Sequence, residues 1–353
     1  MVIHNGLLYG IVEGGGITKA VLFEYNPMSN ALAIKHIFQG TTGYVPDANI
    51  TVAFDKIYGT TFNGGVDAGV IYSFDLETNV FSKLAEFPHA MGYYRNGALL
   101  EYQHKLYGTT VAGGTLNDGI LFSFDLNTNT LNKIADMASI GAAEASGGMV
   151  RFFNNGTKFY GGTREGGANN GGVIYEYDPL ANKLTKKIDL SATMGTFING
   201  AMVVYDQKLY GLARSGASMS QGTLFRYDPV LNQYQPRLIF QREFSGAYPV
   251  GTLCLYNDKL YGLPNEGGAN NQGALIEYDP DVNGYHRRVD LGSSNGFRPE
   301  GKLTYYSGKL YGVTSSGGNF NKGVIYSYDI ATHTYAIRYH MTTATGNVDD
   351  EGV

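Results

Sequence analysis

The chain is poor in several residue types. It has one cysteine, no tryptophan and 16% charged residues over 353 positions, whereas about 25% charged residues is usual. One cysteine excludes an internal disulfide. Cys254 lies in the apolar segment GTLCLY, which predicts an inert residue buried in a strand.

Clusters of basic residues and long apolar stretches are also missing. The net charge is −5 and no cluster of Lys and Arg occurs, which argues against a nucleic-acid groove. No apolar stretch reaches the roughly 18 residues of a membrane span, and no signal peptide is visible at Met1. The acidic stretch Asp349-Asp350-Glu351 lacks the spaced ligands of a cation loop.

Motifs of catalysis and metal binding are absent as well. The seven histidines fall at different repeat positions, and neither H-x-x-x-H nor C-x-x-C occurs. We therefore expect no cofactor, no metal site and no catalytic residue that a motif identifies.

What the chain does contain is a Tyr-Gly pair repeated seven times. Successive pairs are 49, 49, 53, 50, 51 and 50 residues apart. The tyrosines of these pairs are Tyr9, Tyr58, Tyr107, Tyr160, Tyr210, Tyr261 and Tyr311. A period near 50 that recurs along the whole chain predicts one supersecondary unit, stacked or closed in a ring.

Each repeat contains four short apolar segments. In the third repeat they are Ala98–Tyr102, Lys105–Thr110, Ile120–Asp125 and Leu131–Met137. All are rich in β-formers or alternate, and Gly, Asn or Asp bounds each one. We call the four expected strands a, b, c and d. Strand d carries the basic residues, which predicts a solvated outer edge.

Two recurring features read as turn chemistry. Asp or Asn, in four repeats followed by Pro, opens the c–d corner, and Asn stands four residues later, replaced by His333 in the last repeat. These residues are typical of tight turns, so the repeated carboxylates are not expected to be catalytic. The Gly pairs of the b–c loop have no helix after them, which excludes a phosphate loop.

The two ends of the chain complement each other. Joined to the first residues, Glu351-Gly352-Val353 reproduces the pattern that begins at Glu300 in the last repeat. The sequence thus predicts an all-β, seven-bladed β-propeller with four antiparallel strands per blade. The N- and C-termini together would complete strand a of the first blade and close the ring.

We expect a single domain over residues 1–353. Its repeats are predicted near residues 1–42, 43–91, 92–142, 143–194, 195–245, 246–295 and 296–346, with 347–353 completing the first blade.

The repeat resembles two known families. The pattern K-L-Y-G, Gly pair and Y-D-P resembles a kelch repeat, although the kelch tryptophan is missing and the Gly pair lies further from the Tyr. LYGTTVAGGTLNDGILF and IYGTTFNGGVDAGVIY are more similar to the Gly-rich bacterial tandem repeat of the Gloeo/Verruco type. That resemblance covers all seven repeats and implies large, often exported bacterial proteins, which favours a secreted or cell-surface location without excluding the cytoplasm. It implies no catalytic residues.

Function is expected where the repeats differ. The d–a and b–c loops should open on one face of the propeller, and they are longer and more variable than the a–b and c–d turns. Before the Gly that starts strand a, one column reads Tyr44, Tyr93, Glu144, Thr196, Ala247, Phe297 and Val348. The next reads Val45, Tyr94, Ala145, Phe197, Tyr248, Arg298 and Asp349, and the third reads Pro46, Arg95, Ser146, Ile198, Pro249, Pro299 and Asp350.

A further variable column lies four residues after the Tyr of each Tyr-Gly pair. It reads Glu13, Phe62, Val111, Arg164, Arg214, Asn265 and Ser315. Arg164 and Arg214 belong to adjacent repeats, with Glu165 and Glu266 in the same kind of loop. The tentative ligand-binding residues are Tyr44, Tyr93, Tyr94, Arg95, Arg164, Arg214, Phe197, Tyr248, Phe297, Arg298 and Glu13.

These residues favour a binding role on the d–a/b–c face. Aromatic rings suit the apolar faces of sugars, and Arg, Glu and Asn suit their hydroxyl groups. The first hypothesis is a monomeric, non-catalytic binding propeller for a glycan or protein ligand, without nucleic-acid partners. One alternative is a polysaccharide lyase that uses Tyr and Arg on the same face; another is a structural repeat of a larger surface protein. Inter-blade ion pairs and packed aromatics would equally explain any single residue.

Overall fold

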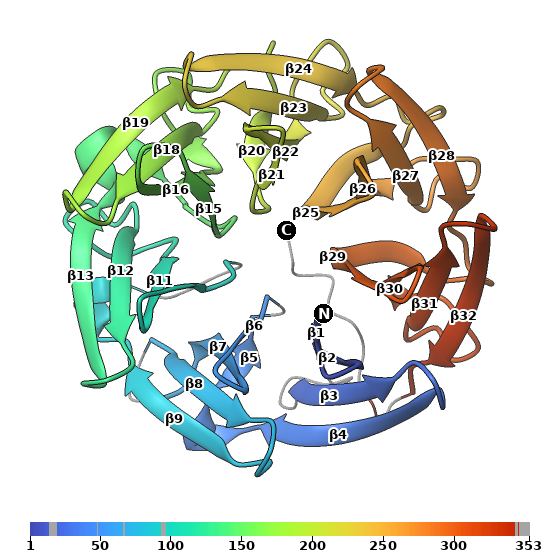
Figure 1. The fold of residues 1–353 in the computed structure, drawn as a ribbon, viewed down its shortest axis with the longest axis horizontal. Coiled ribbons are helices and arrows are strands. Elements are labelled where there is room, and N and C mark those ends of the chain that lie inside the picture. Colours follow the sequence, from blue (N-terminus) through green and yellow to red (C-terminus); the bar gives the residue numbers. More distant parts are fainter. Residues whose placement is uncertain (14–19, 48, 66–67, 93–96, 343–344, 346–353) are drawn as a thin grey trace.

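A computed structural model describes the chain except residues 14–19, 48, 66–67, 93–96, 343–344 and 346–353. Seven antiparallel β-sheets are arranged as blades around a central axis (Figure 1). Each blade follows the order a, b, c, d from the axis outwards. The predicted seven-bladed propeller is therefore confirmed.

The strands nearest the axis form the a positions, and in three blades this position is split into two short strands. They are β1 (Val2–His4), β5 (Tyr44–Pro46) and β6 (Thr51–Ala53), β10 (Leu100–Tyr102), β14 (Ala142–Ala143) and β15 (Met149–Phe153), β20 (Thr196–Ile198) and β21 (Val203–Tyr205), β25 (Ala247–Tyr256) and β29 (Phe297–Tyr306). The b strands are β2 (Leu7–Glu13), β7 (Lys56–Asn63), β11 (Lys105–Thr109), β16 (Thr157–Gly162) with β17 (Glu165–Gly166), β22 (Lys208–Ser215), β26 (Lys259–Glu266) and β30 (Lys309–Ser316).

The outer half of each blade is more regular. The c strands are β3 (Ala20–Asn26), β8 (Val70–Asp75), β12 (Ile120–Asp125), β18 (Val173–Asp178), β23 (Thr223–Asp228), β27 (Ala274–Asp279) and β31 (Val324–Asp329). The d strands are β4 (Ala31–Phe38), β9 (Phe81–Glu86), β13 (Thr130–Asp136), β19 (Lys183–Asp189), β24 (Gln233–Ile239), β28 (Gly284–Asp290) and β32 (Thr334–His340). Three short 3-10 helices lie in d–a loops: η1 (Gly40–Thr42), η2 (His89–Met91) and η3 (Met137–Ile140).

Backbone hydrogen bonds define the two faces of the ring. The b–c loop of a blade donates to the d–a loop that enters the same blade, as in Gly167 N to Gly141 O (2.6 Å) and Gly268 N to Arg242 O (2.8 Å). We call this side the loop face. On the other side the c–d turn donates to the a–b turn, as in Leu126 N to His104 O (2.9 Å). We call this side the turn face.

The turn chemistry expected at the c–d corner is confirmed. The Asp228 carboxylate accepts hydrogen bonds from the backbone N–H groups of Val230 (2.9 Å) and Leu231 (3.0 Å). Asn232 has a φ of 52° and its Oδ1 accepts from the Tyr227 hydroxyl at 2.7 Å. A carboxylate engaged in this way shapes a turn and is not available for catalysis.

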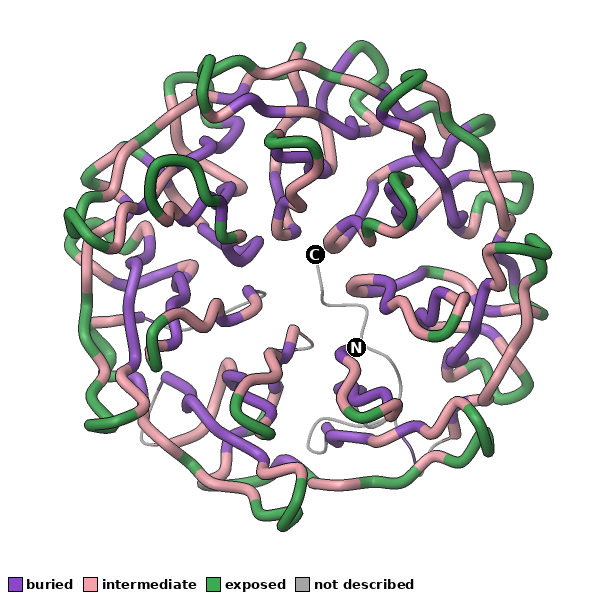
Figure 2. The backbone as a smooth tube through the Cα atoms, in the orientation of Figure 1, coloured by how far each residue is buried: buried purple, intermediate pink, exposed green. Residues whose placement is uncertain are grey.

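The hydrophobic core lies between the blades. Each of the seven buried clusters joins two neighbouring blades, for example Leu22 and Phe38 of the first blade with Tyr72 and Phe74 of the second. The c strands are almost wholly buried, whereas the d strands are exposed or half-buried (Figure 2). The solvated outer edge predicted for strand d is thus confirmed.

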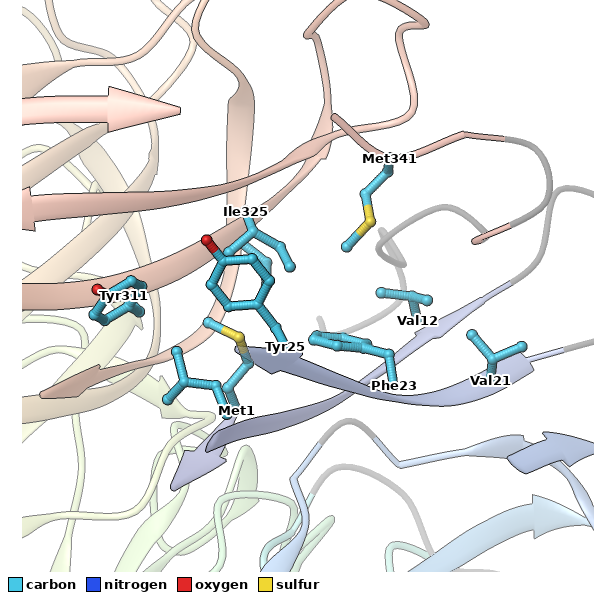
Figure 3. Close-up of a cluster of buried hydrophobic side chains, with 10 residues drawn as sticks. Met1, Val12, Val21, Phe23, Tyr25, Tyr311, Ile325 and Met341 are labelled. Carbon is cyan, nitrogen blue, oxygen red and sulfur yellow. The ribbon is translucent and has the colours of Figure 1, made fainter. Parts of the chain in front are cut away.

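The first and last blades pack directly on each other. Met1 and Tyr25 lie in one buried cluster with Tyr311, Ile325 and Met341 (Figure 3). The Thr304 hydroxyl of β29 donates to the backbone carbonyl of Met1 at 2.7 Å. Strand β1 occupies the a position of the first blade, while the contribution expected from residues 347–353 falls outside the described residues.

Glycines bring the a strands close together near the axis. A Cβ atom on Gly200 would lie 1.9 Å from the carbonyl oxygen of Gly251, and one on Gly251 would lie 2.0 Å from that of Gly301. Only glycine allows backbones to approach so closely. The residues just before these glycines therefore lie around the axis on the loop face.

Candidate binding site on the loop face

A left-handed residue recurs in the a strands on the loop face. Its φ angle lies between 51° and 63° in the five blades where it is described. In four of them it stands three positions before the close-approach glycine, whereas in the second blade the place of that glycine is taken by Ala48. The residues are Val45, Glu144, Phe197, Tyr248 and Arg298. Such angles are unusual for residues other than Gly, Asn and Asp.

Backbone hydrogen bonds to the preceding blade hold three of these residues in place. The N–H groups of Phe197 and Tyr248 donate to the carbonyls of Gly171 (3.1 Å) and Gln221 (2.9 Å) in the neighbouring b–c loops. That of Arg298 donates to Gln272 at 3.2 Å. The left-handed turn therefore fastens adjacent blades through the backbone, and the side chain takes no part in the bond.

The strand register places two variable columns opposite each other. One contains the left-handed residues, and the other lies four residues after the Tyr of each Tyr-Gly pair. Thr196 pairs with Ser215 and Ile198 pairs with Ala213, so Phe197 lies across from Arg214. The same relation sets Tyr248 across from Asn265, and it recurs in the other described blades. Two columns that are 17 residues apart in most blades thus form one ring of facing side chains.

The fourth blade shifts the sequence alignment by one residue. A Cβ on Gly147 would lie 2.7 Å from the Gly200 carbonyl, in the same relation as Gly200 to Gly251. Gly147 is therefore the equivalent glycine, although Gly148 was the one used to align the loops. Glu144, and not Ala145, takes the left-handed place that Phe197 and Tyr248 occupy in the next two blades.

Arg164 lies between β16 and β17, half-buried. Its backbone N–H donates to the Glu144 carbonyl at 3.1 Å. Its Nε lies 3.7 Å from Glu144 Oε2, which is too far for a hydrogen bond. This Nε is buried and has no hydrogen-bond partner among the described residues. The nearest carboxylate is thus Glu144, whereas the sequence had suggested Glu165.

Arg214 ends β22 in the adjacent blade and is also half-buried. Burial lowers the pKa of its guanidinium, and the positive charge of Arg164 lowers it further. Its Cζ lies 6.0 Å from the centre of the Tyr248 ring. Within the described part of the chain, Arg214 makes no hydrogen bond and no ion pair.

Arg242 is a residue that the sequence reasoning missed. It lies in the d–a loop before β25, with its Cζ 5.3 Å from the Tyr248 ring. Its Nη1 donates to Glu266 at 2.6 Å and to Asn271 at 2.9 Å, and the bond to Glu266 raises its pKa. Glu266, expected beside Arg214, is therefore engaged by Arg242. A basic residue in a variable loop was the only sequence signal for it.

A second ring of polar residues was also missed. It lies two positions after the left-handed residue, directly before the close-approach glycine, and includes Ser146, Asn199 and Glu300. Glu300 is 5% exposed, and the Asn265 amide reaches it at 3.5 Å. The Ser146 hydroxyl and both polar atoms of the Asn199 amide are buried without a hydrogen-bond partner in the described structure. Polar residues before a strand glycine were the available signal.

The other predicted residues are less closely grouped. Tyr44 is exposed and pairs with Asn63 at the end of β7. Phe297 is half-buried, and Arg298 is exposed. Tyr93, Tyr94, Arg95 and the side chain of Glu13 lie outside the described residues.

Neither a metal site nor a membrane span is found among the described residues. No group of three or more His, Cys, Asp and Glu side chains is placed to hold a metal ion. No helix among these residues is long and apolar enough to cross a bilayer. The thiol of Cys254 has its pKa raised to about 11 by burial, as suits the inert residue expected there.

One family model matches the chain along its whole length. It describes the Gloeobacter/Verrucomicrobia repeat and matches residues 1–157, 141–290 and 238–353. No curated protein matches the sequence.

Solved structures share the fold at low sequence identity. A puromycin hydrolase matches with a TM-score of 0.63 and 11% identity, over 96% of this chain and 52% of that one. The β-propeller domain of the Trilobed protease from Pyrococcus furiosus matches with a TM-score of 0.56 and 11% identity, over 97% and 95%. TolB from Acinetobacter baumannii has a TM-score of 0.48 and 14% identity, with coverage of 79% of this chain and 62% of TolB. These matches concern the fold alone.

Proposed function

The chain belongs to the family of the Gloeobacter/Verrucomicrobia repeat, and we propose that it is a non-catalytic binding propeller whose loop face holds a glycan or protein ligand. In a repeat family the shared residues build the blades, so a ligand must be recognised by side chains that differ between blades. The proposed binding site is the ring of facing side chains around the axis on the loop face.

One observation carries this proposal. The two columns that vary most between the repeats lie opposite each other in the a and b strands. They present Phe197, Arg214, Tyr248 and Asn265 from adjacent blades. Backbone hydrogen bonds hold the left-handed residues, so this contact between blades does not need the side chains of Phe197 and Tyr248. A set of variable polar and aromatic side chains on one rigid rim is typical of a ligand site.

The residue types favour a glycan. Tyr248 and Phe197 offer half-buried rings of the kind that stack on sugars, and the guanidinium of Arg214 offers hydrogen-bond donors.

A glycan array with the purified protein tests the proposal. We expect binding to a defined glycan class, and we expect Tyr248→Asn to weaken it by about tenfold, as loss of an aromatic anchor does. Asparagine tolerates the left-handed backbone at this position, so the variant should fold. Tyr285→Asn, an exposed tyrosine of β28 on the outer edge, is the matched control and should bind normally.

Two results would contradict this assignment. If Tyr248→Asn bound the same glycan as tightly as the parent, the site would lie elsewhere. If no glycan bound, a protein ligand or a structural role within a larger surface protein would be the better hypothesis.

One contact supports a second candidate function, a polysaccharide lyase. Tyr248 lies between two arginines, with Arg214 and Arg242 at 6.0 and 5.3 Å from its ring centre. A tyrosine base next to arginines that neutralise a uronate is a workable arrangement for β-elimination. Incubation with a panel of polyuronates would then produce the ultraviolet absorbance of an unsaturated uronate, and Tyr248→Phe would abolish it.

A further inference from the structure

We propose that the ligand of the loop face is an acidic saccharide whose oxyanion group, a carboxylate or a sulfate, is bound between Arg164 and Arg214. This inference rests on the proposed function and specifies it, because it names the chemical group that the site recognises. It also places the anion at one point of the ring, between the fourth and fifth blades.

The two guanidinium groups belong to adjacent blades and are partly shielded from water. Arg164 and Arg214 stand at the same position of adjacent blades, and both are half-buried. After burial, the charge of Arg164 has the largest influence on Arg214. Two like charges held near each other away from water are unfavourable unless an anion lies between them.

In its described part the protein gives Arg164 a single ion pair without a hydrogen bond, and gives Arg214 none. The carboxylate nearest to Arg164 is Glu144, at 3.7 Å, and the buried Nε of Arg164 has no hydrogen-bond partner. The carboxylates that influence Arg214 are Glu266 and Glu300, of which Glu266 is bound by Arg242 at 2.6 Å. Arg214 itself makes no ion pair with a described residue.

Other arginines of the same protein show what a structural arginine looks like here. Arg242 binds Glu266 and Asn271. Arg288 on the outer strand β28 binds both oxygens of Glu277, at 3.0 and 2.9 Å. In both cases the fork of donors is used within the protein. Arg164 and Arg214 keep theirs free of such bonds in the described structure, which distinguishes a binding role from a structural one.

Further unused donors lie just beyond the left-handed ring. The hydroxyl of Ser146 and the amide of Asn199 are buried and lack partners in the described structure. Ser146 is two residues after Glu144, and Asn199 is two residues after Phe197, in the blades that carry the two arginines. Buried polar groups are normally hydrogen-bonded. A ligand bound near the axis, together with its hydration water, would supply hydrogen-bond partners for these two groups.

A saccharide fits the surroundings of the arginine pair. Phe197 lies across from Arg214, and the Tyr248 ring lies next to it. These rings would contact the apolar face of a sugar whose acidic substituent reaches the guanidinium groups. A small free anion would make no use of the rings.

Matched oligosaccharides test the inference by isothermal titration calorimetry. The probes are trigalacturonate, its carboxyl-reduced galactose counterpart and a sulfated galactose trisaccharide. We expect an acidic probe to bind and the neutral one to bind at least about tenfold more weakly, because the charged hydrogen bonds are lost. The preferred acidic probe identifies the oxyanion as carboxylate or sulfate.

Variants locate the anion. Arg164→Gln and Arg214→Gln should each weaken the acidic probe by about tenfold or more. Lys183→Gln, which removes an exposed positive charge at the start of the outer strand β19, is the control and should change affinity less than about threefold. Equal binding of the neutral and acidic probes would overturn the inference and leave the proposed function standing. Equal displacement of the bound probe by poly-glutamate would overturn the assignment to a saccharide.

A spectroscopic readout covers the case in which the three trisaccharides bind too weakly for calorimetry. The side-chain Nε–H signals of Arg164 and Arg214 can be followed in protein labelled with ¹⁵N-arginine. Addition of galacturonate or galactose sulfate should shift both signals and leave that of Arg288 in place. If neither signal moved with either anion, the inference would fail even where neutral glycans bound the array.

Discussion

His36 is an ionisable residue whose surroundings disfavour its charged form. It projects from β4 and stacks on Phe81 of the next blade, with ring centres 3.9 Å apart and planes 5° from parallel. Its Nε2 is buried without a hydrogen-bond partner in the described structure. Burial lowers the pKa of His36 from 6.5 to about 4. The folded protein thus holds a neutral imidazole where the unfolded chain would bind a proton.

The depressed pKa predicts a loss of stability in acid. Above pH 6.5 His36 is neutral in both states, and as the pH falls toward 4 only the unfolded state gains a proton, so folding becomes less favourable. His36→Phe retains a ring for the stack and removes this effect. Allowing for partial exposure, its advantage in unfolding free energy should grow by about 1 to 2 kcal/mol between pH 7 and pH 4.5.

Urea unfolding of both proteins at several pH values would measure this difference. Parallel stability curves for His36→Phe and the parent protein would contradict the buried neutral state.

Single residues also show where sequence reasoning reaches its limit. The position of Arg164 and Arg214 on the loop face followed from the repeat, but their neighbours did not. Glu144 reaches Arg164 from a different loop, and Glu266 turns to Arg242, which is 24 residues earlier in the chain. Pairs that form between two loops depend on how the loops meet in space, and spacing in the sequence carries no information about that.

At the scale of elements, the c–d turn shows what the repeat does determine. In the described blades the residue four places after the opening Asp or Asn has a φ between 49° and 58°. It is Asn in six blades and His333 in the seventh, where the ring Nδ1 lies 2.7 Å from the Tyr328 hydroxyl. Asparagine adopts this conformation more easily than histidine, and its Oδ1 accepts the same hydrogen bond.

We therefore expect His333→Asn to stabilise the protein. The gain should be about 0.5 to 1 kcal/mol, the usual size for a residue better suited to its turn. Thermal unfolding would show it as a rise in the midpoint temperature. The reverse change, Asn283→His in the sixth blade, is the control and should destabilise by a similar amount; a neutral result in both directions would rule out the explanation.

The one-residue shift in the alignment of the fourth blade has a local cause. The fourth repeat is 53 residues from the third, and its extra residues lie in the a–b hairpin between β15 and β16. Two consecutive glycines, Gly147 and Gly148, precede that hairpin. The sequence offered no reason to prefer one of them, whereas the approach to Gly200 distinguishes them at once.

At the scale of the whole molecule, one of the seven interfaces differs from the others. Six pairs of neighbouring blades are joined by a d–a loop as well as by packing. The first and last blades are joined in the described structure by packing around Met1, Tyr25, Ile325 and Met341 and by the Thr304–Met1 hydrogen bond, with no described loop between them. In a closed ring this interface is needed as much as the other six. Because no described loop connects its two blades, we expect local unfolding to begin there.

Equivalent core substitutions should therefore differ in their dynamic effect. Ile325→Ala at the closing interface and Ile174→Ala between the fourth and fifth blades should each cost about 2 to 4 kcal/mol. Only Ile325→Ala should speed hydrogen exchange selectively in the first and last blades. Equal exchange in all blades of the Ile325→Ala protein would show that the ring opens as readily elsewhere.

The left-handed residues of the a strands have a consequence for how such proteins diversify. Their backbone N–H groups fasten the blades, as at Phe197, Tyr248 and Arg298, and their side chains are left out of that bond. Selection can thus exchange these side chains, and those facing them, without rebuilding the frame. The rim behaves like the variable loops of an antibody set on a constant scaffold, so two members of one lineage can share every blade and prefer unrelated targets.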